Sequence, residues 1–475
     1  MTRQTWVLAL ASLGAFMISL DSLVVTTALG TIRQDLGASL EELEWTVNAY
    51  NLSFAVLLLT GAALGDRWGR RRVFAGGLAV FTLASAACAL APDASWLIAA
   101  RVAQGVGAAF TMPLALTLLS AAFPPERRGR AIGLFSGVAG LATFVGPFVG
   151  GAIAAGPSWK WIFWINVPVG VLAIVGVLAK IDESHGPDSQ LDLVGLLLAT
   201  AGVLGLVWAL VRSGASGWGS AEVLAALALG IVLIVAFAGW ERRVPAPMLP
   251  MRLFRNRAFT TANLANFALF AVLYGMFFFF AQFFQTAQGV GPLEAGLRLL
   301  PATGALMIVA PVAGALADKV GERVFTVAGL GLWGISLGWL ALVADPGVPY
   351  LQILPLLVVG GVGVSMAIPA VQKAAVGAVA PAEIGKASGA VTTLRFLGGV
   401  FGVAVAGMLF TSTGGYGSPH EFSAGFAAAM GGVGVIALLG AVAALGMPGR
   451  RRVPTPERGA RGMTRTPSPG TEPVA

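Results

Sequence analysis

Long apolar runs separated by short polar breaks recur along the 475-residue chain. A helix needs about 20 apolar residues to cross the hydrocarbon core of a bilayer, and many of these runs are that long. Strands of a membrane barrel would instead alternate over segments of roughly ten residues, a pattern that we do not find. The runs predict an all-α membrane protein with fourteen spanning helices, at residues 6–29, 45–64, 73–92, 95–121, 131–154, 161–180, 191–211, 219–240, 259–287, 293–316, 324–343, 350–371, 384–411 and 422–446.

The composition agrees with a membrane protein, since 57% of the residues are hydrophobic and only 11% are charged. Ordinary soluble domains carry about 25% charged residues. The net charge of +8 raises nucleic-acid binding as an alternative, but the positions of the charges argue against it. Alternate loops and both tails hold most of the basic residues, whereas the opposite loops hold only Arg33, Lys160, Arg212 and Arg298. Basic residues concentrate on the cytoplasmic side, so we expect both termini in the cytoplasm of a multi-pass cell-membrane protein.

A short charged pattern occurs twice in the chain. GAALGDRWGRRRV at 61–73 follows the second apolar run, and VAGALADKVGER at 312–323 repeats its aspartate, glycine and basic residues. Glycines and a proline within 101–113 return in the same order 256 positions later, within 357–369. The landmarks therefore predict a duplicated six-helix unit. Parallel repeats of this kind build two bundles that rock about a central site in transporters.

The duplication divides the chain into four parts. We expect an N-terminal six-helix bundle at 1–182, two inserted spanning helices with their linkers at 183–257, a C-terminal six-helix bundle at 258–447 and a cytoplasmic tail at 448–475. The tail is rich in Pro, Arg, Ser and Thr, a composition that predicts disorder. The lone cysteine, Cys88, excludes an intrachain disulfide.

Several motifs occur in an order that resembles one family. The segments are GDRWGRRR after the second helix, LDSLVVTTALGTI at 20–32, RVAQGVGAAFTMP at 101–113, GVAGLATFVGPFVGG at 137–151, WKWIFWINVPVG at 159–170 and LRFLGGVFGVA at 394–404. Together they resemble the fourteen-helix drug:proton antiporters of the major facilitator superfamily, over about residues 5–446. The resemblance implies the major facilitator fold, alternating access, no cofactor, a proton gradient as the driving force and function as a monomer. Thr27, Gly30 and Ala62 depart from the motifs as the family usually has them.

The repeated charged loop has two interpretations. Its basic residues fix the loop on the cytoplasmic side, which is a purely topological role. The resemblance implies in addition a conformational latch, in which Asp66 contacts a helix N-terminus or an arginine across the seam between the bundles and a glycine permits close approach. The predicted latch residues are Gly65, Asp66, Arg67, Gly69, Arg70, Arg71, Asp318, Lys319, Gly321 and Arg323.

Asp21 and Arg101 are ionisable residues placed inside predicted spans. At 1.5 Å per residue, Asp21 lies roughly 12 Å and Arg101 roughly 9 Å from the outer surface, so the two share a depth. Intramembrane ionisable groups often mark proton relays. A permanent ion pair that holds two helices together is the structural alternative. The resemblance favours proton coupling, with Asp21 as carrier and Arg101 tuning it.

Glycines and a proline are dense in the fifth predicted helix. They are common in membrane helices and permit close packing, but the resemblance implies a hinge at the bundle seam and favours export over import. The residues of this predicted hinge are Gly137, Gly140, Gly146, Pro147, Gly150 and Gly151.

Polar residues interleaved with phenylalanines predict a cavity for a large, partly apolar compound. The alternative is that these phenylalanines face lipid or fill the core. For Arg395, the alternative is a structural role in which backbone carbonyls accept its hydrogen bonds. The candidate cavity residues are Asn48, Asn51, Asn263, Asn266, Tyr274, Gln282, Gln285 and Arg395.

Three hypotheses on function follow. The first is a proton-coupled antiporter that exports lipophilic drug-like or antibiotic compounds, with the substrate, protons and the lipid bilayer as partners. The others are a dedicated exporter of one endogenous metabolite and a non-transporting membrane sensor. An enzyme is disfavoured, because His185 and His420 both lie in loops and the chain lacks a metal-ligand cluster and a convincing catalytic set. The phosphate-binding motif of an ATP-driven pump is absent as well.

Overall fold

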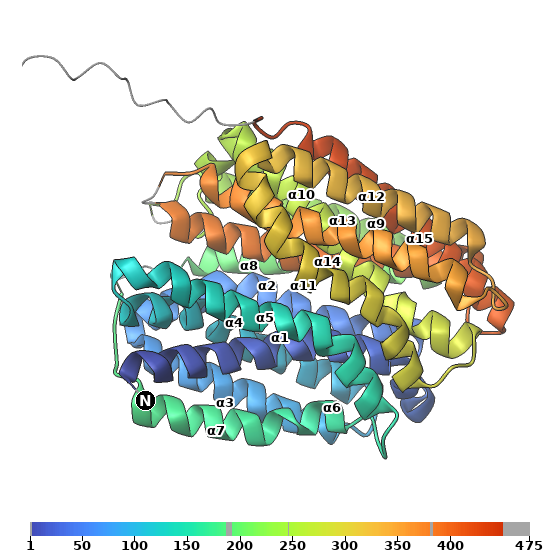
Figure 1. Cartoon of the computed structure of the whole chain (residues 1–475), viewed down its shortest axis with the longest axis horizontal. Helices are drawn as coiled ribbons and strands as arrows, with labels where there is room; N and C mark the ends of the chain where they lie inside the picture. The colour runs from blue at the N-terminus through green and yellow to red at the C-terminus, as the bar shows by residue number, and fades with distance from the viewer. Residues whose placement is uncertain (1, 187–191, 246, 381–382, 450–475) are drawn as a thin grey trace, which may run out of the picture.

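The structure is a computed structural model that describes residues 2–186, 192–245, 247–380 and 383–449. Most of the predicted tail at 448–475 therefore lies outside the described residues. Helices dominate the described chain (Figure 1). They are α1 (Arg3–Leu36), α2 (Leu40–Trp68), α3 (Arg70–Ala89), α4 (Ala94–Ala122), α5 (Pro125–Ala154), α6 (Trp161–Trp164), α7 (Asn166–Lys180), α8 (Leu193–Ser216), α9 (Ala221–Trp240), η1 (Met251–Arg255), α10 (Arg257–Gln282), η2 (Phe283–Ala287), α11 (Pro292–Val320), α12 (Glu322–Val343), α13 (Tyr350–Gly377), α14 (Ile384–Thr413) and α15 (Pro419–Ala444).

Fourteen segments of the described chain are long and apolar enough to cross a membrane, as predicted. The short α6 joins α7 in one span, and η2 completes the span of α10. Several helices extend beyond their apolar runs, because polar residues cap them. Ser39 starts α2 with a capping box, in which its hydroxyl accepts from the Glu42 backbone while the Glu42 carboxylate accepts from the Ser39 backbone. The polar first turn of α2 is therefore helical.

The spanning helices form two halves that meet along a seam (Figure 1). Helices α1 to α7 make up the N-terminal half and α10 to α15 the C-terminal half. Three helix pairs line the seam, namely α2 with α14, α5 with α11, and α1 with α10. At the α2–α14 pair, Phe54 and Phe396 pack with ring centroids 4.1 Å apart.

Helix positions repeat with the offsets seen in the sequence. Helix α12 begins 252 positions after α3, and α13 begins 256 positions after α4. The joints are alike too, because Gly69 ends α2 at φ 106° and Gly321 ends α11 at φ 111°. Residues other than glycine rarely adopt such angles. Gly69 and Gly321, two of the three predicted latch glycines, thus form the same sharp helix-to-helix joint in each half.

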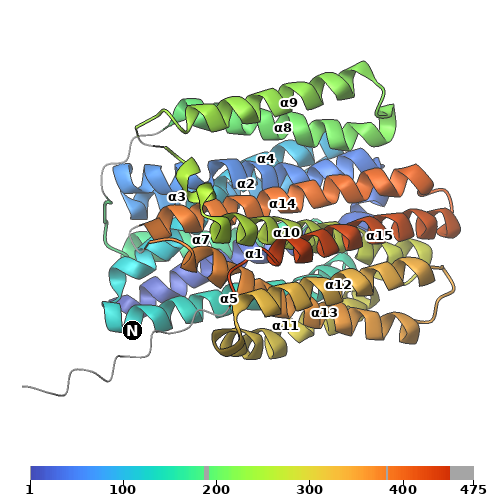
Figure 2. The ribbon, with the colours of Figure 1, turned by 90° about the horizontal axis from the view of Figure 1, so that it is seen from above.

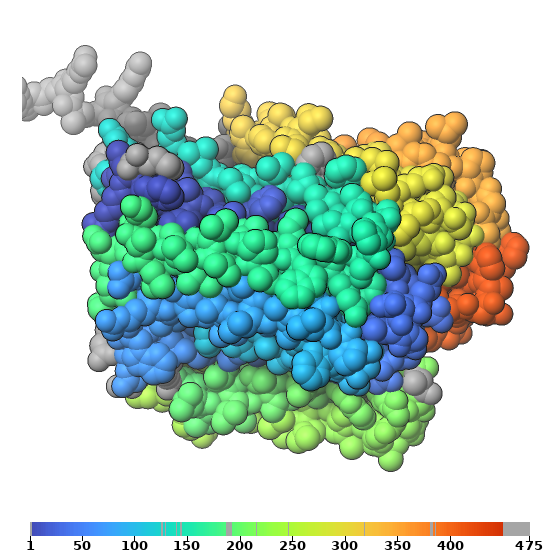
Figure 3. All heavy atoms as spheres, turned by 90° about the horizontal axis from the view of Figure 1, so that it is seen from below, coloured from blue at the N-terminus to red at the C-terminus, as the bar shows by residue number. Residues whose placement is uncertain are grey.

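Helices α8 and α9 lie outside the two halves, as expected for an insertion (Figure 2). Val207 and Val211 of α8 pack against Leu52 and Val400, which belong to α2 and α14. Helix α9 covers α8 and exposes much of its apolar surface, such as Val235 at 65%. A helix that is apolar all round suits a lipid environment. From below, α8 and α9 form an edge beside the N-terminal half (Figure 3).

Candidate functional site

Four helices of the N-terminal half bring polar side chains together in a buried cluster. Asp21 lies on α1, Ser85 on α3, Arg101 and Gln104 on α4, and Asn166 at the start of α7. None of them is more than 3% exposed. We call these five residues the Asp21 cluster. Ionisable groups are costly inside a membrane protein and commonly mark functional sites.

Both oxygens of the Asp21 carboxylate accept hydrogen bonds. Arg101 Nη1 lies 2.5 Å from Asp21 Oδ2. Gln104 Nε2 and Asn166 Nδ2 donate to Oδ1 at 2.8 Å and 3.0 Å. Gln104 Nε2 also lies 2.8 Å from the hydroxyl oxygen of Ser85. A buried charge is tolerated when it is paired and hydrogen-bonded, and the Asp21 cluster meets both conditions.

Arg101 links the cluster to the neighbouring helix α2. Its Nε donates to the backbone oxygen of Thr46 at 3.0 Å, and its guanidinium carbon lies 4.2 Å from the centroid of the Tyr50 ring. The Tyr50 hydroxyl in turn donates to the backbone oxygen of Ile18 on α1 at 3.2 Å. A movement of Arg101, which lies on α4, would therefore change contacts with both α1 and α2.

The sequence indicated that Asp21 and Arg101 share a depth, and the structure places them in contact. Sequence reasoning did not find the other members of the cluster. Gln104 follows Arg101 by three positions and so lies on the same face of α4, which is a signal that was available. Ser85 and Asn166 are single polar residues on other helices, and only the packing of those helices brings them together.

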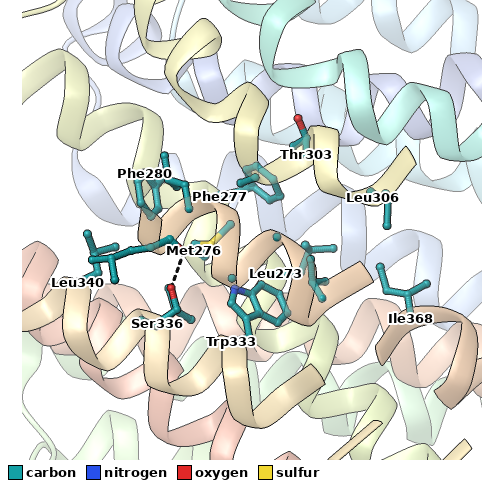
Figure 4. Close-up of a pocket in the computed structure, with 17 residues that line it drawn as sticks. Leu273, Met276, Phe277, Phe280, Thr303, Leu306, Trp333, Ser336, Leu340 and Ile368 are labelled. Atoms are coloured by element: carbon teal, nitrogen blue, oxygen red, sulfur yellow. Dashed lines mark hydrogen bonds between the residues drawn. The ribbon is translucent and has the colours of Figure 1, made fainter. Parts of the chain in front are cut away.

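A pocket in the C-terminal half lies between α10, α11, α12 and α13 (Figure 4). It lies between the side chains of these four helices and opens in part to the surroundings. Its lining is apolar except for the hydroxyls of Thr303 and Ser336, and the Ser336 hydroxyl donates to the backbone oxygen of Leu356 at 2.5 Å. Apolar side chains such as Met276, Phe277 and Trp333 point toward this space (Figure 4).

This pocket is the counterpart of the Asp21 cluster in the duplicated fold. The position 252 residues after Asp21 holds Leu273, and the position 256 residues after Arg101 holds Leu357. Both leucines line the pocket, as does Gly360, the counterpart of Gln104. The same place in the two halves is therefore an ion pair in one and an apolar cavity in the other.

The predicted latch residues of the first loop make contacts within their own half. The Asp66 carboxylate oxygen Oδ1 lies 2.8 Å from Arg70 Nε and 2.7 Å from Arg70 Nη2. The backbone N–H groups of Arg71 and Arg72 donate to the Glu183 carboxylate at 2.8 Å and 3.2 Å. Glu183 caps the N-terminus of α3, where a negative charge is favoured. It follows the sixth span, and the sequence analysis did not single it out.

Gly65 has a packing role beside this loop, because the side chain of Leu114 on α4 occupies the space that a Cβ would take. Arg67 lies in the last turn of α2.

In the second copy, Lys319 lies in the last turn of α11 and Arg323 in the first turn of α12. The side chain of Asp318 lies outside the described part of the chain. Next to them, Lys373 Nζ of α13 lies 3.4 Å from the Glu322 carboxylate.

The predicted hinge of α5 divides into two parts. Gly150 packs against Val24 and Thr27 of α1, and Gly151 packs against the backbone of Pro292 on α11. Gly146 lies against Leu23, while the backbone oxygen of the buried Pro147 faces Gly296 of α11. Among the described residues, Gly137 and Gly140 have no neighbour within 4 Å of a Cβ position. Close helix contact is therefore confined to the second part of the motif.

The candidate cavity residues do not form a single site, and none of them lines the apolar pocket. Asn263 and Gln285 are 22 residues apart and lie near opposite ends of the span formed by α10 and η2. Asn263 donates to its own helix at Phe259, and Asn266 Nδ2 donates to the backbone oxygen of Val391 at 3.0 Å. These amides therefore contribute to helix packing.

Arg395 and Tyr274 lie on facing helices at the seam. The guanidinium carbon of Arg395 is 4.2 Å from the centroid of the Phe270 ring, a cation–π contact. Among the described residues, no hydrogen bond reaches Arg395 Nε. The Tyr274 ring lies 6.5 Å from that of Phe396 and packs against Gly399.

The two halves are joined near the last turn of α1, which we call the Arg33 end. Gln285 Nε2 donates to the backbone oxygen of Thr27 at 2.8 Å, and the Gln285 side chain lies against Gly30. The Arg33 guanidinium carbon lies 3.9 Å from the centroid of the Tyr416 ring in the α14–α15 connection. The opposite end, where Asp66 lies, we call the Asp66 end. The seam is thus closed by direct contacts at the Arg33 end.

Two similar six-helix halves, a seam of paired helices and a buried ion pair define a multi-pass membrane transporter. The sequence profile of the Major Facilitator Superfamily matches residues 11–321 and 299–473. The chain belongs to that superfamily, as the sequence motifs indicated.

Relatives with known names are similar over most of the chain. Multidrug resistance protein Stp of Mycobacterium tuberculosis (strain CDC 1551 / Oshkosh) is 35% identical over 411 residues, which cover 86% of this chain and 76% of that protein. The cephamycin export protein CmcT of Amycolatopsis lactamdurans is 36% identical and covers 95% of this chain and 94% of its own. The tetracenomycin C resistance and export protein of Streptomyces glaucescens is 34% identical, with coverages of 84% and 75%.

Solved structures agree with the fold. The crystal structure of the peptide transporter POT in complex with sulfate has a TM-score of 0.68 at 16% identity and covers 92% of this chain and 93% of its own. A bacterial homolog of the human lysosomal transporter Spinster, in an inward-facing and unoccupied conformation, has the same score and identity, with coverages of 96% and 99%. At this identity the likeness concerns the fold alone.

Proposed function

We propose that this protein is a proton-coupled antiporter that exports lipophilic drug-like or antibiotic compounds by alternating access. Asp21 is the proton carrier and Arg101 tunes it. The protein acts as a monomer in the cell membrane, with the Asp66 end and both termini in the cytoplasm. It uses the proton gradient as its driving force and needs no cofactor.

The observation that supports proton coupling is the Asp21 cluster. Its carboxylate depends on one cationic partner, since Arg101 supplies the charge and the amides of Gln104 and Asn166 supply neutral donors. If Arg101 moves away during the transport cycle, a buried carboxylate loses its compensating charge and takes up a proton. Return of Arg101 releases that proton. The contact between Arg101 and α2 links this exchange to helix movement.

The latch and the hinge support alternating access. The seam is closed at the Arg33 end, where Gly151 and Gly296 let α5 and α11 approach. Asp66 pairs with Arg70 in its own half here. In the opposite state, Asp66 exchanges this partner for one across the seam and holds the cytoplasmic side shut. The domain limits at residues 182 and 257 separate the two moving bundles from the inserted helices, and the limit at 447 separates the C-terminal bundle from the tail.

The apolar pocket supports a lipophilic substrate. Pockets with mostly apolar walls and few polar groups bind partly apolar compounds, and Thr303 and Ser336 are the polar groups offered here. Compounds with aromatic or aliphatic parts therefore fit better than compact polar metabolites. The names of the relatives, which refer to multidrug resistance and to antibiotic export, agree with this class of substrate.

Gradient-driven efflux of ethidium from proteoliposomes tests the proposal, with the intact protein and Asp21→Asn compared. We expect efflux by the intact protein and its loss in the folded variant. Equal efflux by both would keep the exporter and remove Asp21 as carrier. If the intact protein moves neither ethidium nor a panel of other lipophilic compounds, the dedicated exporter or the membrane sensor replaces the proposal.

A further inference from the structure

We propose that Glu44 is a second proton-binding site, located where α2 meets α14 at the Arg33 end, and that it holds a proton whenever this part of the seam is closed. The inference rests on the proposed function for the direction of proton movement. It concerns a different carboxyl group from Asp21 and a different step, the closing of the outer seam.

Glu44 is buried between the two halves. Its side chain is on α2, the residue is only 3% exposed, and its Oε1 lies against Gly407 of α14. Among the described residues, no hydrogen bond reaches Oε2. The absence of a side chain at Gly407 is what makes room for the carboxyl group. Opening the seam between α2 and α14 would return the same group to water.

The charged groups around Glu44 are engaged with other partners. Glu41, one turn earlier on α2, lies 3.0 Å from Arg212 of α8. Arg33 of α1 stacks on the ring of Tyr416. Glu44 and Arg33 both act on Tyr416 from nearby, since burial and Glu44 raise the pKa of its hydroxyl and Arg33 lowers it. Among the described residues, no ion pair joins Glu44 to a cation, and Glu41 adds a second negative charge one turn away.

A row of amides continues from Glu44 into the molecule. Asn48 and Asn51 follow at intervals of four and three residues, so all three side chains share one face of α2. Both asparagines are at most 1% exposed, and neither amide group has a hydrogen-bond partner among the described residues. The row reaches about 10 Å along the helix. Buried polar groups are normally satisfied by protein or by water, so these amides suit a hydrated path for the proton.

The physical argument concerns the charge of a buried carboxyl group. An ionised carboxylate without a partner costs far more to bury than a neutral one, and such groups take up a proton instead. Closure of the seam therefore transfers one proton from water at the Arg33 end to the Glu44 carboxylate. In an exporter driven by proton entry, this proton leaves toward the cytoplasm along the Asn48 and Asn51 row. Glu44 thus ties closure of the outer seam to external protons.

Distance measurements between spin labels test this inference without any transport assay. Labels at Gln34→Cys and Ser412→Cys, both exposed at the Arg33 end of opposite halves, report the closed and open seam in a Cys88→Ala background. In the otherwise intact protein, we expect the ratio of closed to open seam to fall as pH rises above the ordinary range of a glutamate carboxyl, by at most tenfold per pH unit, the limit for one coupled proton. Glu44→Gln should stay closed throughout.

Two further variants keep the test decisive. Glu41→Gln removes a partly buried carboxyl group, which pairs with Arg212, from the same helix and should keep the pH dependence. Gly407→Ala places a methyl group where the Glu44 carboxyl lies, so it should lower the closed fraction at every pH, which checks the contact even if Glu44→Gln fails to fold. The inference is wrong if Glu44→Gln shifts with pH as the intact protein does, or if Gly407→Ala leaves the closed fraction unchanged.

The outcomes separate this inference from the proposed function. A pH-insensitive Glu44→Gln together with an intact protein that moves no lipophilic compound would keep the proton site and remove the exporter. If the intact protein exports with proton entry and Glu44→Gln keeps the pH response of the intact protein, the exporter stays and the Glu44 proton site is removed.

Discussion

The apolar counterpart of the Asp21 cluster suggests a direct test of how much the ion pair contributes to stability. The C-terminal half carries Leu273 and Leu357 where the N-terminal half carries Asp21 and Arg101. Replacing one residue, Arg101→Leu, leaves a buried charge. Replacing both, Asp21→Leu with Arg101→Leu, copies the arrangement that the chain already folds in its other half.

The geometry of the ion pair gives the expected changes in the free energy of unfolding. Removing one member of a buried ion pair costs about 3–5 kcal/mol, because the remaining charge is uncompensated. Asp21 and Arg101 are each 1% exposed as side chains, so water cannot relieve that cost without rearrangement. The double replacement removes both charges and loses the hydrogen bonds from Gln104 and Asn166, at about 1 kcal/mol each. The double variant should therefore be more stable than Arg101→Leu alone by about 1–3 kcal/mol.

Unfolding in detergent micelles, followed by tryptophan fluorescence, measures the free energy of unfolding of the intact protein, of Arg101→Leu and of the double variant. The double variant should also fold into the closed-seam arrangement while failing to couple transport to protons. A double variant no more stable than Arg101→Leu would refute the reasoning, because charge compensation would then not be what holds the cluster together. Full proton coupling in the double variant would show that the ion pair is only structural.

Three further predictions concern other parts of the molecule. Burial raises the pKa of the Glu241 carboxyl from 4.5 to about 7, so the free energy of unfolding should fall as pH rises between these values and level off above; Glu241→Gln should abolish this fall in a pH series of unfolding curves. Gly151→Val should open the seam at the Arg33 end, because a side chain meets the backbone of Pro292, whereas Gly140→Val should not change the spin-label distance there. Thr303→Phe should fill the apolar pocket and lower ethidium efflux several-fold at unchanged melting temperature, and unchanged efflux would exclude this pocket as the binding place.

The sequence contained most of the information about the fold. The number of spans follows from run length, because each helix must cover the hydrocarbon core on its own. The pairing of the halves follows from the repeat, and the sharp joints at Gly69 and Gly321 follow from glycines that the repeat preserves. The first turn of α2 does not follow from the apolar pattern, since its polar residues resemble a loop and only the Ser39 capping box indicates a helix start.

The candidate site was less accessible from the sequence. Asp21 and Arg101 stand out as charges in apolar runs, but Asn166 is recognisable as their partner only after α1 and α7 pack together. The sequence does not distinguish Glu44 from a loop residue, because it lies just before an apolar run, although the structure buries it against Gly407. The sequence shows which residue is polar, whereas helix packing decides which polar residue is buried and beside what.

The most direct test of the central claim follows protons and drug together. Proteoliposomes with a lipophilic substrate gradient but no initial pH difference carry a pH-sensitive dye inside, and both fluxes are recorded. Proton-coupled export predicts that substrate leaving the lumen drives protons into it, so the lumen acidifies with the intact protein and does not with Asp21→Asn. Substrate movement by the intact protein without any change in luminal pH would contradict the account.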